Sequence, residues 1–166
     1  MGLVMTDFNK KVLKLLQEDA RYTAAQIATA LGAPEKAVAD AISELEKEGV
    51  IIKYAALING AKVENGVQAI IEVKVAPQKL KGFDAYAEDL YNFAEVKDLM
   101  LVSGGFDLFI TVESADITGV AKFIAEKLSV IDGIVGVATH FILKKYKIDG
   151  AVVSVPEESK RQIIQA

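Results

Sequence analysis

Cysteine and tryptophan are absent from this chain, and histidine occurs only once. The lack of cysteine excludes a disulfide framework and thiol chemistry, and one histidine without cysteines cannot by itself form a metal site. We therefore expect neither a metal nor a cofactor. No hydrophobic run approaches the roughly 20 residues that a membrane span requires, and no signal-peptide pattern is present. These absences predict a cytoplasmic protein that does not associate with membranes.

Arginine is also scarce, because Arg21 and Arg161 are its only occurrences, and the formal net charge is -4. The chain as a whole therefore exerts no electrostatic attraction on nucleic acid. Apolar residues, in contrast, make up 52% of the 166 residues, and the mean hydropathy is +0.29. A small chain with so much apolar surface is expected to bury part of it between subunits. The composition thus predicts a homo-oligomer.

Three short helices separated by tight turns are predicted for the first fifty residues. Apolar residues recur at helical spacing over residues 6–18. Thr23-Ala-Ala-Gln26 fits a capping box that opens a second helix, which Gly32 is expected to end. Pro34 suits the first position of a third helix. Because the last two helices are joined by a very short turn, the segment predicts a helix-turn-helix unit whose second helix can enter the major groove of DNA.

The following part of the chain switches repeatedly between strand spacing and helix spacing. The predicted elements are a strand at 68–75 that is closed by Pro77, a helix at 83–94, strands at 99–102 and 108–112, a helix at 117–128 and a last strand at 134–145. This β-α-β-β-α-β order predicts a ferredoxin-like antiparallel sheet with both helices on one face. The second face of such a sheet would expose apolar side chains, so we expect two copies to form a dimer by apposing their sheets.

The sequence therefore predicts an α+β chain with two domains and a tail. The helix-turn-helix domain and an extended connector occupy residues 1–60, and the ferredoxin-like domain occupies residues 61–148. The tail, residues 149–166, contains a possible edge strand from Ala151 to Val155, and no chemistry is assigned to it.

Several motifs occur in an order and spacing that is typical of one family. Leu45-Glu-Lys-Glu-Gly-Val-Ile51 is similar to a Leu-Glu-x-x-Gly-Val-Ile ending, Gly104-Gly-Phe-Asp107 is similar to a Gly-x-x-Asp loop, and Thr139 follows Asp132-Gly-Ile at the start of the last strand. Together they resemble the leucine-responsive/asparagine-C (Lrp/AsnC) transcription regulators over about residues 6–147. The resemblance implies a winged-type helix-turn-helix domain that binds promoter DNA. It also implies a RAM-type dimerisation domain that assembles dimers into larger homo-oligomers and binds an amino acid or related metabolite between them.

The predicted recognition helix departs from that family. Its members usually carry basic residues in the middle of this helix, whereas this chain has Asp40-Ala41 there. Phosphates would repel a helix that presents Asp40 and Glu44, so we expect weak affinity for double-stranded DNA per subunit, offset by several units on one oligomer. The candidate DNA-binding residues are Thr23, Gln26, Lys36, Ser43 and Lys53. An alternative role is open for three of them, since Thr23 and Gln26 could only cap their helix and Lys36 could be a solvated surface charge.

The Gly-x-x-Asp loop supplies the candidate effector site. Two adjacent glycines let a ligand approach backbone amides closely, and Asp107 could pair with an amino group. The candidate effector-binding residues are Ser103, Gly104, Gly105, Phe106, Asp107 and Thr139. In the alternative interpretation the glycines only form a turn and Asp107 only caps it. His140 is expected to be a packed or interfacial residue that could make an interface sensitive to pH.

Three functions are compatible with these patterns. The first is a DNA-binding transcription regulator that responds to an amino acid at subunit interfaces. The second is an oligomeric ligand-binding protein with weak or lost DNA binding, which the acidic third helix suggests. The third is an enzyme similar to tetrapyrrole decarboxylases of the same architecture. The third function would need several cations around a pocket. Arginine is scarce, the only histidine has no obvious partner, and no acid/base constellation is present, so we expect no enzymatic activity.

Overall fold

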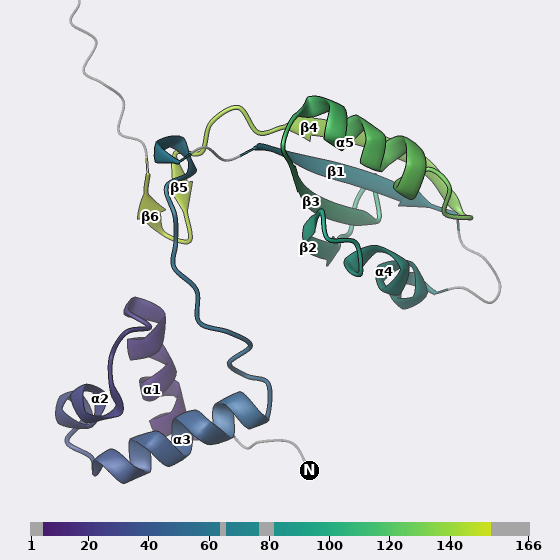
Figure 1. The fold of residues 1–166 in the computed structure, drawn as a ribbon. Helices are drawn as coiled ribbons and strands as arrows, with labels where there is room; N and C mark the ends of the chain where they lie inside the picture. Colours follow the sequence, from purple (N-terminus) through teal and green to yellow (C-terminus); the bar gives the residue numbers. More distant parts are fainter. Residues whose placement is uncertain (1–4, 64–65, 77–81, 154–166) are drawn as a thin grey trace, which may run out of the picture. The chain divides into compact units, whose positions relative to one another are not determined.

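The computed structural model describes residues 5–63, 66–76 and 82–153, which fall into two compact units (Figure 1). The first unit is Met1–Ile58 and the second is Asn59–Ala166. In the described part of the chain, no helix has the length and apolar character needed to cross a membrane.

The first unit contains the three predicted helices, α1 (Asp7–Glu18), α2 (Ala24–Leu31) and α3 (Glu35–Lys47). Gly32 ends α2 in the left-handed conformation with φ 63°, which glycine adopts without steric cost. One detail was predicted wrongly, because Pro34 is the N-cap residue of α3 and not its first helical residue. The helices enclose a core of buried apolar side chains from all three: Val12, Leu16, Ile27, Ala28 and Val38.

The second unit is built on a four-stranded antiparallel sheet in the order β2-β3-β1-β4. Its strands are β1 (Val67–Val75), β2 (Val96–Leu101), β3 (Leu108–Ser114) and β4 (Ile134–Phe141). Helix α4 (Phe83–Tyr91) connects β1 to β2, and α5 (Ile117–Phe123), which continues into the π-helical turn η2 (Ile124–Leu128), connects β3 to β4. Both helices pack on the same face of the sheet (Figure 1). The predicted ferredoxin-like topology is therefore confirmed.

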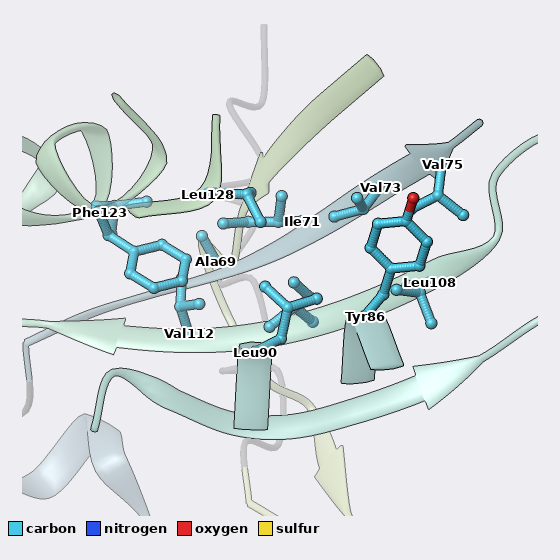
Figure 2. Close-up of a cluster of buried hydrophobic side chains, with 12 residues drawn as sticks. Ala69, Ile71, Val73, Val75, Tyr86, Leu90, Leu108, Val112, Phe123 and Leu128 are labelled. Carbon is cyan, nitrogen blue, oxygen red and sulfur yellow. The ribbon is translucent and has the colours of Figure 1, made fainter. Parts of the chain in front are cut away.

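The core of this unit lies between the sheet and the two helices (Figure 2). Every second side chain of β1 enters it, as the alternation predicted, and these four are fully or almost fully buried: Ala69, Ile71, Val73 and Val75. Tyr86 and Leu90 reach the core from α4, whereas Phe123 and Leu128 reach it from α5 and η2. Hydrogen bonds in a π-helical turn join residues five positions apart. Phe123 and Leu128 are separated by five positions, so both can face the sheet.

The apolar spacing that predicted a helix at 83–94 only partly matches the buried face of α4. Phe83 and Tyr91 share this spacing with Leu90, but they are 43% and 56% exposed. Tyr86 is 1% exposed in their place, and its hydroxyl donates to the Ala76 carbonyl oxygen at 3.4 Å. The hydroxyl thus has a partner at the edge of the core, so burying the ring leaves no polar atom unsatisfied.

The open face of the sheet is less apolar than predicted. Ile70 and Phe109 are partly exposed there, but charged side chains lie among them. His140 lies directly across from Ile70, and its Nε2 is 3.7 Å from the Glu72 carboxylate. The dimer formed by apposing sheets stays a prediction, and this mixed surface would have to accommodate charges as well as apolar contacts.

The segments at the two ends of the described second unit lie together. The short helix η1 (Gly60–Lys62) follows the connector, and β4 is followed by a hairpin of β5 (Lys147–Ile148) and β6 (Ala151–Val152). The Asn59 side-chain amide donates to the Val153 carbonyl oxygen at 3.0 Å. The predicted tail strand is therefore one arm of this hairpin over Ala151–Val152, and residues 154–155 lie outside the described residues. The last strand of the sheet ends at Phe141, four residues earlier than predicted, because its pairing with β1 stops at Ala69.

Replacing Leu90 with alanine should lower the free energy of unfolding by about 2–5 kcal/mol, because it leaves a cavity in the core. The matched control is Tyr91→Ala at the next position of α4, where the exposed ring should contribute no more than about 0.5 kcal/mol. Urea denaturation of both variants measures the difference. Equal losses would show that the buried face of α4 is assigned wrongly.

Candidate functional site

The outward face of α3 is defined by the residues opposite its packed face. Val38, Ala41 and Leu45 are buried against the other helices. Residues four, seven and eleven positions after Lys36 lie within about 60° of it around the helix, and all of these side chains are exposed. We call this set the α3 stripe: Lys36, Asp40, Ser43 and Lys47. Glu44 lies about 40° farther around the helix than Asp40 and flanks the stripe.

Within the α3 stripe, Lys36 and Asp40 form an ion pair. The Lys36 Nζ lies 2.7 Å from the Asp40 carboxylate, one helical turn away. With two lysines and one aspartate the stripe has a formal charge of +1, so it is less acidic than the sequence suggested. Both side chains of the pair are exposed, and such a pair contributes only about 0–1 kcal/mol. Phosphate can therefore compete with Asp40 for the lysine at little cost.

Other cations of the first unit are paired in the same way. Arg21 contacts Asp19 at 2.7 Å, and Lys10 contacts Asp7 at 3.4 Å. The Arg21 hydrogen bonds to the carboxylate lower the pKa of Asp19 to about 2, so Asp19 keeps its charge throughout the physiological range. Three of the seven basic residues between residues 5 and 58 thus face an acidic partner within the unit.

Thr23 and Gln26, the two candidate residues at the start of α2, form a capping box. The Gln26 backbone N–H donates to the Thr23 hydroxyl at 3.2 Å, and the Thr23 backbone N–H donates to the Gln26 side-chain oxygen at 2.8 Å. Both side chains therefore satisfy backbone groups that a helix start leaves unpaired. This geometry favours the capping role for Thr23 and Gln26 over direct contact with DNA.

The connector after α3 is extended and carries Lys53 exposed. Next to Lys53, the Tyr54 hydroxyl donates to the Glu46 carboxylate at 2.9 Å and ties the connector to the end of α3. Partial burial, together with this hydrogen bond to an anion, raises the pKa of Tyr54. Sequence reasoning missed both this contact and Lys47. Counting helical positions outward from Val38 and Leu45 would have found Lys47.

In the second unit the Asp107 carboxylate is bound by β1. One of its oxygens accepts from the Val75 backbone N–H at 3.0 Å, and the other lies 3.1 Å from the Lys74 Nζ. The Val75 hydrogen bond is the main cause that lowers the pKa of Asp107, and Lys74 adds to it, while partial burial opposes both. Because β1 and β4 shift register between Lys74 and Val75, the carboxylate satisfies an N–H at this irregularity. The contacts favour a structural role for Asp107 over pairing with a ligand's amino group.

The remaining loop residues lie together at the β2–β3 connection. Ser103, Gly104 and Gly105 are exposed and Phe106 is partly buried. A Cβ atom added at either glycine would meet nothing within 4 Å, so the space beside their backbone is open. Thr139 does not join this group, because it pairs with Ile71, four residues along β1 from Val75, which is about 13 Å. Within one chain the structure therefore unites five of the six effector candidates.

Comparison with known proteins decides the family. The winged helix-turn-helix DNA-binding model matches residues 5–52, and the Lrp/AsnC ligand binding domain model matches residues 68–152. An uncharacterised HTH-type transcriptional regulator of Bacillus subtilis (strain 168), YugG, is 41% identical over 162 residues, which are 96% of this chain and 98% of that protein. The chain belongs to the Lrp/AsnC family of transcriptional regulators.

Further relatives agree with this membership. The HTH-type transcriptional regulator LrpA of Pyrococcus horikoshii is 34% identical over 139 residues, or 84% of this chain and 96% of that protein. A Neisseria meningitidis transcriptional regulator, solved as its complex with L-methionine, has a TM-score of 0.70 at 24% identity and covers 92% of this chain and 97% of its own. Escherichia coli AsnC has a TM-score of 0.67 at 18% identity, and the match covers 88% of this chain and 97% of that one. These two structures show the shared fold. Because Lrp/AsnC proteins are transcriptional regulators and not enzymes, the decarboxylase alternative is set aside.

In this Lrp/AsnC regulator, Thr23→Ala should lower the free energy of unfolding by about 1 kcal/mol, since it removes the side-chain half of the capping box. Ser43→Ala, on the α3 stripe, is the control and should leave stability unchanged. Thermal or urea unfolding of the two variants checks this. A Thr23→Ala variant as stable as the wild type would contradict the capping role.

Asp107→Asn should make the free energy of unfolding less dependent on pH in the acid range. The folded protein holds the pKa of Asp107 below its ordinary value of about 3.9, so its ionised form contributes stability above that pH and loses it as the pH falls through the folded pKa. Between pH 5 and pH 2 the variant should therefore show a shallower fall in unfolding free energy than the wild type. Asp132→Asn, in an exposed turn, is the matched control. Identical slopes for wild type and Asp107→Asn would contradict the assignment.

Proposed function

We propose that this Lrp/AsnC regulator binds double-stranded DNA through the α3 stripe and changes its assembly or geometry when an amino acid binds the second unit. The observation that carries the DNA-binding half is the division of α3 into a packed face and an exposed face with two lysines, a serine and one aspartate. Lysines and hydroxyls are groups that contact phosphates and base edges in the major groove. Lys53 on the connector supplies a further cation.

Affinity per helix-turn-helix unit is expected to be weak. Asp40 and Asp19 each hold a cation that would otherwise be free to meet phosphate. Several units on one homo-oligomer compensate for this, because binding of the first raises the effective concentration of the others. We propose that the homo-oligomer is assembled from dimers through the second unit, whose sheet leaves Ile70, Phe109 and Met100 accessible on its open face.

The effector half of the proposal has different support. The Lrp/AsnC ligand binding domain model covers the second unit, and the structurally similar Neisseria meningitidis regulator was solved with L-methionine. An amino acid that binds one arrangement of subunits more tightly than another shifts the equilibrium between them. Ser103, Gly104, Gly105 and Phe106 remain effector candidates because their loop is open. Thr139 could complete a site only with a loop from another subunit.

Footprinting on the DNA upstream of the regulator's own gene tests the DNA-binding half. Protection is expected at low salt and should decline steeply as salt rises, because released counterions contribute most of the affinity. The oligomer should be verified by light scattering in the same buffer. Absence of protection by the fully assembled protein at low salt would favour the alternative, an oligomeric ligand-binding protein that has lost DNA binding, which the three internal ion pairs of the first unit make worth testing.

Asp40→Asn should tighten DNA binding by roughly threefold to tenfold, because it frees Lys36 and removes one repelling charge from the α3 stripe. Asp7→Asn is the matched control, since it makes the same change in charge and frees Lys10 on α1. Fluorescence anisotropy over a salt series measures both affinities. An Asp40→Asn gain no larger than that of Asp7→Asn would contradict the placement of DNA on the α3 stripe.

A further inference from the structure

A hollow of about 300 Å3 lies in the second unit between α4 and the hairpin of β2 and β3. Figure 1 shows α4 beside β2, which is an edge strand of the sheet. Both elements contribute apolar side chains to the lining: Phe83, Ala87, Tyr91, Leu99, Leu101 and Leu108. Phe83, Tyr91 and Leu101 are largely exposed although they are large and apolar. Exposed apolar side chains that surround a hollow are typical of a surface that binds another chain segment.

The helix beside the hollow is acidic. α4 carries Asp84, Glu88 and Asp89 and contains no lysine or arginine. Asp84 lines the hollow, and Glu88 lies one turn farther along the same side of the helix. Both residues are exposed, and no described residue forms an ion pair with either of them. The occupant that suits this surface therefore has apolar side chains next to positive charges.

The same face of a second copy does not provide such charges. In a symmetric contact, α4 of one subunit would meet α4 of the other, and each brings three carboxylates and no cation. Like charges that meet in an interface repel each other and weaken it. The occupant must therefore be a different, basic part of a chain.

Segment 154–166 of this chain has the required combination. It lies outside the described residues and follows residues 68–152, which the ligand binding domain model matches. Lys160-Arg161 come directly before Gln162, and the apolar pair Ile163-Ile164 follows. Cations and large apolar side chains thus occur within five consecutive residues. The hollow presents the complement, since Asp84 lies among its apolar lining residues.

The length of the segment allows it to reach the hollow of its own subunit. It follows Val153, whose carbonyl oxygen accepts from the Asn59 side chain of the same unit at 3.0 Å. The ten residues from Ser154 to Ile163 can extend over as much as about 33 Å. The nine residues of β1, the longest strand of the sheet, extend over about 30 Å. A segment of this length can therefore pass along the whole sheet.

We propose that residues 160–164 bind in this hollow within the same subunit. The two isoleucines cover Phe83, Ala87 and Leu101 and remove their exposed apolar surface from water, which is the main favourable contribution. The inference goes beyond the proposed function and does not rest on it, because it requires neither DNA nor an effector.

The charges determine which part of the segment lies on α4. Lys160 and Arg161 pair with the carboxylates of Asp84 and Glu88, which are one helical turn apart. The same carboxylates repel Glu157-Glu158, three residues before the two cations. The basic end of the segment therefore lies on α4, and the acidic part is kept away from it.

Because the chain contains no cysteine, an engineered pair of thiols reports the contact directly. In Ala87→Cys combined with Ile164→Cys, mild oxidation of the full-length protein should form an intramolecular disulfide, since docking brings the two Cβ atoms together. The matched control combines Ala85→Cys with Ile164→Cys. Ala85 is partly buried like Ala87 but lies about 160° around α4 from it, so its disulfide should form at least roughly tenfold more slowly.

Electrophoresis without reductant measures both rates and separates the outcomes. Equal rates for the two pairs would overturn docking in the hollow. A disulfide that joins two subunits would overturn docking within one subunit and assign the hollow to a neighbour's segment.

A fluorescent reporter tests the role of the charges. The chain contains no tryptophan, so Ile164→Trp supplies a single one, whose emission should lie at shorter wavelength and be quenched less by acrylamide than in urea. Asp84→Lys with Glu88→Lys should remove this protection by repelling the segment. Adding Lys160→Glu with Arg161→Glu should restore it, because the attraction returns with the signs exchanged. Glu126→Lys with Asp132→Lys makes the same change in charge elsewhere in the second unit and should leave the emission unchanged.

Each reporter variant is compared only if its Tm shows that it is folded. Emission and quenching equal to those of the urea-unfolded protein in the Ile164→Trp variant would overturn the proposal. Protection that survives the reversal at Asp84 and Glu88 would overturn the assignment of these two carboxylates. Neither result would affect the DNA-binding or effector half of the proposed function.

Discussion

The second unit depends on the alternation of β1. This strand pairs with β3 on one side and β4 on the other, and its four inward side chains from Ala69 to Val75 meet both helices (Figure 2). Side chains alternate with a period of two, so a slip of one residue would expose all four and bury the polar set. Register, helix packing and the position of the β2–β3 loop thus follow from one strand. The Asp107 carboxylate, bonded to the Val75 N–H, holds the loop at that strand's end.

The first unit shows how a weakly charged domain can still present cations. Three of the seven basic residues between residues 5 and 58 lie in short-range ion pairs such as Lys36–Asp40. Exposed pairs of this kind are weak and are screened by salt, so they exchange readily for phosphate. In the homo-oligomer that we propose, selectivity for a DNA site would depend on how many subunits engage at once and less on the strength of any one contact. Assembly and DNA recognition would then be coupled.

Sequence patterns predicted the topology and most element boundaries, because capping residues and a period of two or 3.6 are local signals. Thr23 with Gln26, Gly32 and the alternating residues of β1 are clear examples. The errors came from tertiary context. The hydroxyl of Tyr86 finds a partner at Ala76, so Tyr86 is buried while Phe83 stays exposed, and helical spacing alone does not distinguish them.

The candidate sites were less predictable than the fold. Loop composition located the five adjacent effector candidates, but the role of Asp107 depends on Lys74 and Val75, more than thirty residues away in the sequence. The ion pair of Lys36 with Asp40 has the ordinary four-residue spacing and was predictable in principle. The hollow between α4 and the β2–β3 hairpin, lined by Leu99, Leu101 and Leu108 among others, was not predictable. It arises from side chains that helical and strand patterns both assign to the core.

The hydrogen bond between the Asn59 side chain and the Val153 carbonyl bears on how this unit could be exchanged in evolution. It brings the start of the second unit beside Val153, the last described residue, so the described chain between them forms a closed module. Modules of this kind are readily transferred between genes, because joining them to a new neighbour strains nothing inside them. The same arrangement would tolerate circular permutation, with a short bridge across Asn59 and Val153 and new ends opened in a surface turn.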